Sequence, residues 1–298
     1  MLQFNIRKVD PEAWIAQIET IRQRICGCSS SEEFRFYFDD DIDITYLKPW
    51  HIVSLACLFD YAISSDDRNV RVFSNDEIAN FFDDDLHLSQ YFKDIPYIEA
   101  ETKQIMNLWK VEAAQSYAYS NSLTRYLKRE YFKGKDLTAF NNALNELYAN
   151  VADHAHAAGV AYSYIRYDEA RRAIGVAFCD FGVGIPTSLR EAMQIPPEGM
   201  GFVEHSMRPG VSARSSTHNA GLGLDDVLSL IRDSDKTFRV VSNREIYINS
   251  ISENGREQQT SLLDFCFNGT LIDFELDVSG FEDEEIIGES DLFGDIDW

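Results

Sequence analysis

Residues 136–159, "DLTAFNNALNELYANVADHAHAAG", decide the fold. An aspartate opens the stretch and a glycine closes it, and both are cap signals of an α-helix, so we predict one helix from about residue 137 to 157. Its apolar residues recur at helical spacing and form a stripe toward a core. Glu146, Asn150 and His154 follow one another at intervals of four and form a second row along the edge of that stripe. Taken alone, such a row is most often a polar helix flank.

Two strands are predicted directly after this helix. The segments "AYSYIRY" (161–167) and "AIGVAFCD" (173–180) enclose a polar turn, which is typical of an antiparallel hairpin. The second strand ends at Asp180, and "FGVGIP" follows at once. Gly182 and Gly184 in that segment permit a tight turn and a close approach of backbone to a ligand. The pattern Asp-x-Gly-x-Gly is weak by itself.

A second pair of glycines lies in "GLGLDDV" (221–227). The apolar periodicity behind it predicts a helix, so Gly221 and Gly223 would lie at a helix start, where free N–H groups and the helix dipole favour phosphate oxygens. The stretch 205–224 holds no carboxylate, in a chain of formal net charge −23, and it contains Arg214. These features suit a polyanionic ligand, although a plain glycine-rich connection also accounts for the glycines.

In this order the motifs resemble those of the GHKL ATPase superfamily, which includes gyrase B subunits, MutL, histidine kinases and the anti-sigma-factor serine kinases. The segment "ELYANVADH" (146–154) is similar to the N-box, "DFGVGIP" (180–186) to the first glycine box and "GLGL" (221–224) to the second. The resemblance covers about residues 135–277. It is specific because several weak motifs agree in order and spacing.

A further similarity lies near the end of the matched region. The segments "LLDFCF" and "TLIDFEL" flank Asn268-Gly269, a dipeptide that predicts a two-residue hairpin turn. The family often has a Gly-Thr pair here, which Gly269 and Thr270 match. We therefore predict two strands joined by a turn at this point.

The resemblance implies ATP and Mg²⁺ as cofactors and a role for each matching residue. Asn150 would complete the octahedral shell of a Mg²⁺ held mainly by phosphates and water, and it is the only metal ligand implied. Glu146 would orient and deprotonate the attacking water, and Asp180 would accept a hydrogen bond from the adenine amino group. Contact with the nucleotide is implied for His154, Gly182, Gly184, Ile185, Arg214, Gly221, Leu222, Gly223, Leu224 and Thr270.

The segment 186–220 corresponds to the family's ATP lid. Gly199, Gly201 and Gly210 predict a mobile loop that orders over bound nucleotide. Ala220 departs from the family, in which many members have another glycine, so the extent to which the lid wraps the triphosphate is left open.

Composition predicts a globular, cytoplasmic protein. The 27 basic and 50 acidic side chains disfavour broad nucleic-acid binding and anionic membranes. No apolar run approaches the roughly 20 residues of a membrane span, and the first residues do not resemble a signal peptide. The five cysteines are an odd number and predict free thiols; Cys26-x-Cys28 lacks the second pair that a four-ligand metal site needs.

The predicted fold class is α/β, in four segments. Residues 1–95 alternate strand and helix patterns and predict a small α/β domain with a vague similarity to STAS domains. Residues 96–136 are a connecting region. Residues 137–277 would form a two-layer α/β sandwich of the GHKL type. Residues 278–298 are a predicted acidic, disordered tail.

These expectations favour an Mg-ATP-binding regulatory protein that hydrolyses ATP, with a lid that couples nucleotide state to a protein partner. The alternatives are a serine/threonine protein kinase of the anti-sigma type and a non-catalytic nucleotide sensor or scaffold. A sensor histidine kinase is disfavoured because none of the six histidines lies in a phosphoacceptor motif. A homodimer is left open.

Overall fold

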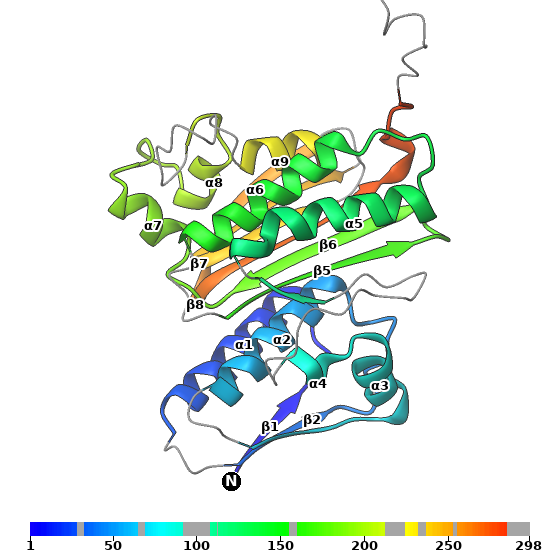
Figure 1. Cartoon of the computed structure of the whole chain (residues 1–298). Coiled ribbons are helices and arrows are strands. Elements are labelled where there is room, and N and C mark those ends of the chain that lie inside the picture. Colours follow the sequence, from blue (N-terminus) through cyan, green and yellow to red (C-terminus); the bar gives the residue numbers. More distant parts are fainter. Residues whose placement is uncertain are drawn as a thin grey trace, which may run out of the picture.

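Sheets and helices alternate in layers through the molecule. The computed structural model describes residues 1–28, 33–64, 69–91, 108–111, 113–154, 160–211, 224–231, 237–252 and 255–284. In this part of the chain a three-stranded sheet, a pair of helices, a five-stranded sheet and a second group of helices lie on one another in that order (Figure 1). The predicted mixed α/β class is confirmed.

The first sheet is parallel, with strand order β1-β2-β3. Its strands are β1 (Leu2–Ile6), β2 (Phe34–Phe38) and β3 (Val70–Phe73). Parallel strands need crossover connections, and helices α1 (Pro11–Cys26) and α2 (Pro49–Ser64) supply them. Asp10 caps α1 by accepting the N–H of Ala13 at 3.0 Å. The similarity to STAS domains stays a prediction.

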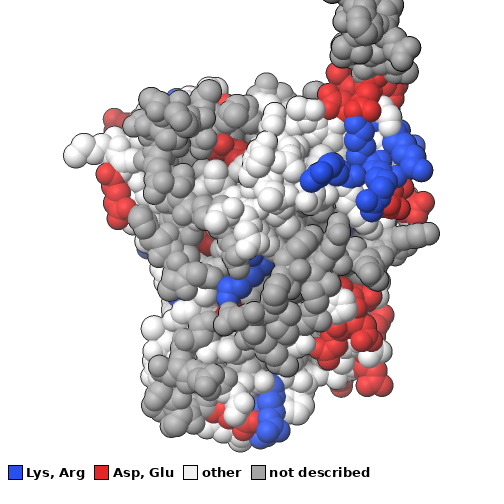
Figure 2. Space-filling model, in the orientation of Figure 1, with Lys and Arg blue, Asp and Glu red and all other residues white. Residues whose placement is uncertain are grey.

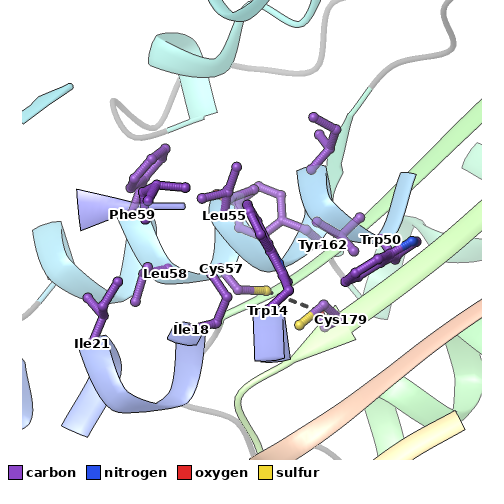
Figure 3. Packing of buried hydrophobic residues seen from close by; sticks show 14 of the residues in the cluster. Trp14, Ile18, Ile21, Trp50, Leu55, Cys57, Leu58, Phe59, Tyr162 and Cys179 are labelled. Carbon is purple, nitrogen blue, oxygen red and sulfur yellow. Dashed lines mark hydrogen bonds between the residues drawn. The ribbon is translucent and has the colours of Figure 1, made fainter. Parts of the chain in front are cut away.

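Helix α2 lies between the two sheets. Every residue from His51 to Asp60 is buried, as expected for a helix that has no solvent face. Figure 3 shows side chains of α1 and α2 packed together, with Tyr162 and Cys179 of the second sheet beside them. None of the helices in the described ranges is both long and apolar enough to span a bilayer.

The second sheet has the order β4-β5-β6-β8-β7, and all its neighbouring strands are antiparallel. The strands are β4 (Trp109–Lys110), β5 (Ala161–Asp168), β6 (Ala173–Asp180), β7 (Phe238–Ser252) and β8 (Gly255–Asp277). The predicted hairpin is formed by β5 and β6. Strand β4 lies in the segment that the sequence indicates as a connecting region, and it pairs with β5. The domain boundaries themselves remain a proposal.

The outer helices cover the face of the second sheet that lies opposite α2 (Figure 1). They are α5 (Ser116–Glu130), α6 (Thr138–His154) and α9 (Leu224–Ile231). The predicted apolar stripe of α6 is buried through Phe140, Leu144 and Leu147. Shorter helices are α3 (Asp76–Asn80), α4 (Leu88–Tyr91), α7 (Ile185–Glu191) and α8 (Phe202–Ser206), with single turns at Phe81–Asp85, Ala113–Gln115 and Val278–Gly280.

The predicted hairpin turn at Asn268-Gly269 is wrong. Strand β8 runs through both residues without a break. The hairpin lies earlier, where Ser252 at the end of β7 pairs with Gly255 at the start of β8. Apolar residues alternate on both sides of Asn268-Gly269, and the strand continues through them because β7 pairs with β8 before and after them and β6 pairs with it from Thr270 on.

The predicted disordered tail begins with residues that are docked on the fold. Phe281 is buried against two phenylalanine rings of the helical layer. Asp283 forms an ion pair with Lys135 at 2.8 Å, and Glu284 forms one with Lys128. Figure 2 shows basic side chains gathered where these acids lie. The sequence did not indicate these partners because they precede the tail by most of the second sheet; the rest of the tail falls outside the described residues.

Candidate functional site

A pocket opens beside the end of β6, under the outer helices. Five of its lining residues were predicted from the sequence, namely Asn150, Asp180, Ile185, Leu224 and Thr270. They come from α6, β6, α7, α9 and β8, so five separate segments converge here. The other lining side chains are six apolar residues and two serines. The pocket measures about 680 Å³, open solvent at its mouth included.

Asp180 is the acidic group in the pocket wall. Its residue is only 5% exposed, and its Oδ1 accepts the backbone N–H of Gly182 at 2.8 Å. Burial raises the pKa of Asp180 to about 7, against the opposing effect of hydrogen bonds from Gly182 and from the backbone and hydroxyl of Thr270. Within the described residues no lysine, arginine or histidine forms an ion pair with this carboxylate.

Thr270 lies beside Asp180 because the two are register partners of β6 and β8, and β8 carries a bulge directly before Thr270. Thr270 pairs with Ser242 of β7. The next register pair along β8 joins Phe267 to Asn243, so the two intervening residues have no partner in β7. One of them, Gly269, has φ +134°, and a Cβ there would lie 2.0 Å from the Asp180 carbonyl oxygen. Only glycine fits at this position.

The loop between β6 and α7 is fastened to β7 by two polar side chains. The N–H of Ile185 donates to Ser242 Oγ at 2.8 Å, and Asn243 Nδ2 donates to the carbonyl of Val183 at 3.2 Å. Gly184 has φ +81°, and a Cβ there would lie 2.6 Å from Asn243 Oδ1. The ligand contact implied for Gly184 stays a prediction; in the structure its missing Cβ makes room for Asn243 of β7.

Ser242 and Asn243 were missed in the sequence. They begin the polar run "SNRE" (242–245), which interrupts the apolar residues of a strand. Such an interruption signals a bulge or a contact to a loop, and it could have drawn attention to both residues.

The predicted row on α6 is partly described. Asn150 lines the pocket. Glu146 lies one turn earlier, is 9% exposed, and is not among the lining residues. His154 ends the helix, and its side chain is outside the described part of the chain.

The first three residues of the second glycine box, Gly221, Leu222 and Gly223, lie outside the described residues, as does Arg214. Leu224, the last residue of the box, begins α9 and lines the pocket. The described part of the predicted lid contains α7 and α8. The N–H of Val203 in α8 donates to Glu245 of β7 at 2.8 Å, so this part of the segment is packed on the sheet.

The described residues include no cluster of three His, Cys, Asp or Glu side chains placed to hold a metal ion. All five cysteines are free thiols, as the sequence predicts. Asn150, the predicted metal ligand, is a lining residue of the pocket, and its role as a ligand stays a prediction.

Comparisons with known proteins leave the family open. No protein-family model matches the chain. No curated protein matches it either. Among solved structures, the chain is similar to the topoisomerase IV ATP-binding domain of Francisella tularensis, solved in complex with a small-molecule inhibitor, with 18% sequence identity and a TM-score of 0.31. The match covers 57% of this chain and 44% of that one, less than half of its length, and a TM-score this low does not establish a common fold.

Proposed function

We propose that the chain binds ATP with Mg²⁺ in this pocket and hydrolyses it. The observation that carries the proposal is the Asp180 carboxylate, buried in the wall of a mostly apolar pocket without an ion-pair partner in the described residues. A flat apolar base with an exocyclic amino group would fill the apolar space and donate to that carboxylate. Adenine has both features.

The resemblance to GHKL ATPases supports the phosphate end of the proposal. Asn150 lines the pocket from α6 and would hold Mg²⁺, which neutralises the phosphates when bound. Glu146, one turn away, would take the proton of the attacking water. The second glycine box would hold phosphate oxygens with its backbone N–H groups. A lid over the nucleotide would then report its state to a protein partner.

Replacement of Asp180 tests the adenine assignment. Asp180→Asn keeps the size of the side chain and removes the charged acceptor, whose hydrogen bond is worth about 1.5–3 kcal/mol, so ATP should bind more than about tenfold more weakly. Titration calorimetry with Mg-ATP measures this. Asp273→Asn is the matched control, because Asp273 is a carboxylate on β8 that lines a different cavity. Equal affinities of the wild type and Asp180→Asn would refute the assignment.

Replacement of Glu146 separates catalysis from binding. Glu146→Ala should keep ATP affinity within a few-fold and lose about 10²–10⁴ in turnover, the range that general-base catalysis supplies. Asn150→Ala should lose affinity and turnover together, because a Mg²⁺ ligand positions the phosphates. Labelled ATP, followed for free phosphate and for labelled protein in the presence of cell lysate, distinguishes an ATPase from a protein kinase. No turnover under any of these conditions would favour the nucleotide sensor.

A further inference from the structure

Helix α1 contacts β8 two residues before Thr270, a pocket-lining residue, through one buried carboxylate. Glu19 is 2% exposed and accepts both the backbone N–H of Asn268, at 3.3 Å, and its side-chain amide, at 3.2 Å. On α1 itself, Arg22 donates to Glu19 at 2.9 and 3.0 Å, and Gln23 donates at 2.9 Å. Donors from two layers of the molecule thus meet at this carboxylate.

This contact lies at the bulge in β8. Asn268 and Gly269 have no register partner in β7, so the polar groups of Asn268 are satisfied from outside the sheet, by Glu19. On the other side, the Gly269 carbonyl accepts Ser242 Oγ at 2.9 Å. Thr270 then donates to Asp180. A short covalent path therefore links the partner of Glu19 to the acid in the pocket wall.

The same helices also contact the residues beside Asp180. The Arg22 guanidinium lies 5.4 Å from the centroid of the Phe181 ring, and Tyr61 of α2 meets that ring edge-on at 5.9 Å. The Cys57 thiol of α2 donates to the Cys179 carbonyl at 3.2 Å (Figure 3). The end of β6 is consequently contacted from the N-terminal side on both sides of Asp180, at Cys179 and at Phe181.

We propose that Glu19 is a positioning residue for the adenine end of the pocket, acting through Asn268 and Thr270 on Asp180, and that it couples the N-terminal helices to nucleotide binding. This inference rests on the proposed function. Coupling between two sites is reciprocal, so bound nucleotide would in turn strengthen the contact between α1 and the bulge. A partner that pulls α1 away would weaken nucleotide binding.

The first arm of the test measures base selectivity. Glu19→Gln keeps the shape and removes the charge, and Asn268→Ala removes the other side of the contact. The control is Glu33→Gln, the same change at an acid paired with Arg35 and Arg71 beside β2. Calorimetry compares ATP with purine riboside triphosphate, which lacks the amino group. Both test variants should bind ATP about five- to tenfold more weakly than the wild type, with a smaller loss for the analogue. A general loss of structure would instead weaken the binding of both ligands alike.

The second arm needs no ligand. The N–H of Gly182 is bonded to Asp180, so its hydrogen exchange reports whether that carboxylate stays in place. Exchange at Gly182 should be faster in Glu19→Gln and in Asn268→Ala than in the wild type or Glu33→Gln. If Glu19→Gln matches Glu33→Gln in exchange and in base selectivity, the coupling is overturned. A wild type without ATP affinity would instead refute the proposed function, and the exchange rates alone would then decide whether Glu19 positions Asp180.

Discussion

The side chain of Asp180 is buried among apolar neighbours and still lines a pocket. Its position after a strand and before a glycine-rich loop was predictable from the sequence. The contacts behind it were not, since Ser242 bonds Thr270 from β7 and Glu19 bonds Asn268 from α1, and both come from distant segments. Glu19 in particular is one acid among 50 in the sequence, and only the packing of α1 on the bulge distinguishes it.

The raised pKa of Asp180 predicts a pH dependence of stability. A carboxyl whose folded pKa of about 7 exceeds the ordinary 3.8 binds its proton more tightly in the folded protein, so stability is full at low pH and falls as pH rises toward 7. Asp180→Asn has no such proton. The unfolding free energy of the variant minus that of the wild type should therefore be about 3 kcal/mol larger at pH 8 than at pH 5. Denaturant titrations at both pH values measure the difference.

Asp273, another buried acid with a raised pKa, does not disturb this comparison. Burial raises its pKa to about 6, and this shift is present in both proteins. A constant stability difference across the pH range would mean that Asp180 is ionised in the folded protein throughout.

At the scale of an element, the dipeptide Asn-Gly lies in two different structural settings in the β7–β8 region. Asn-Gly occurs at 254–255 and again at 268–269. Gly255 of the first begins β8, opposite Ser252 at the end of β7, and the second is a bulge inside β8. Asn-Gly is a turn signal, and what decides against a turn at the second is that β6 pairs with β8 immediately beyond it. Strand neighbours that are distant in the chain cannot be read from a turn signal.

The two glycines of these dipeptides provide a matched pair. Both have positive φ, +110° at Gly255 and +134° at Gly269, but a Cβ at Gly255 meets nothing within 4 Å. Gly255→Ala should cost about 1–3 kcal/mol from backbone strain alone. Gly269→Ala should cost a further 1–3 kcal/mol or so, because its Cβ would overlap the Asp180 carbonyl. Urea unfolding of both variants measures the two losses of stability. Equal losses would mean that a Cβ at position 269 meets no more steric overlap than one at position 255.

At the scale of the molecule, the parallel and antiparallel sheets and most helices follow from apolar periodicity, which is why the α/β class was predictable. The stacking of the layers was not, because nothing in α2 says that its second buried face meets another sheet. The docking of Phe281 was hidden for the same reason, since its partners lie in the helical layer.

Two truncations test where the fold ends. A chain ending at Gly280 loses Phe281, whose ring is buried, and should unfold with about 3 kcal/mol less stability than the full chain. A chain ending at Glu284 keeps Phe281 and the ion pairs with Lys135 and Lys128, and its stability should stay unchanged. Both should bind nucleotide as the full chain does. Thermal unfolding and calorimetry decide, and equal stability of the two truncated chains would show that Phe281 contributes nothing.

The position of α2 between the two sheets also determines when during translation its two faces become covered. Its residues leave the ribosome with β1 to β3, but the strands that cover its other side, β5 and β6, are made only with residues 161–180. Until then the nascent chain presents an uncovered apolar helix, a surface that chaperones recognise and that favours aggregation. A ribosome stalled before residue 161 should therefore hold an incompletely folded chain, and one stalled well after residue 277 a chain in which both sheets have closed on α2.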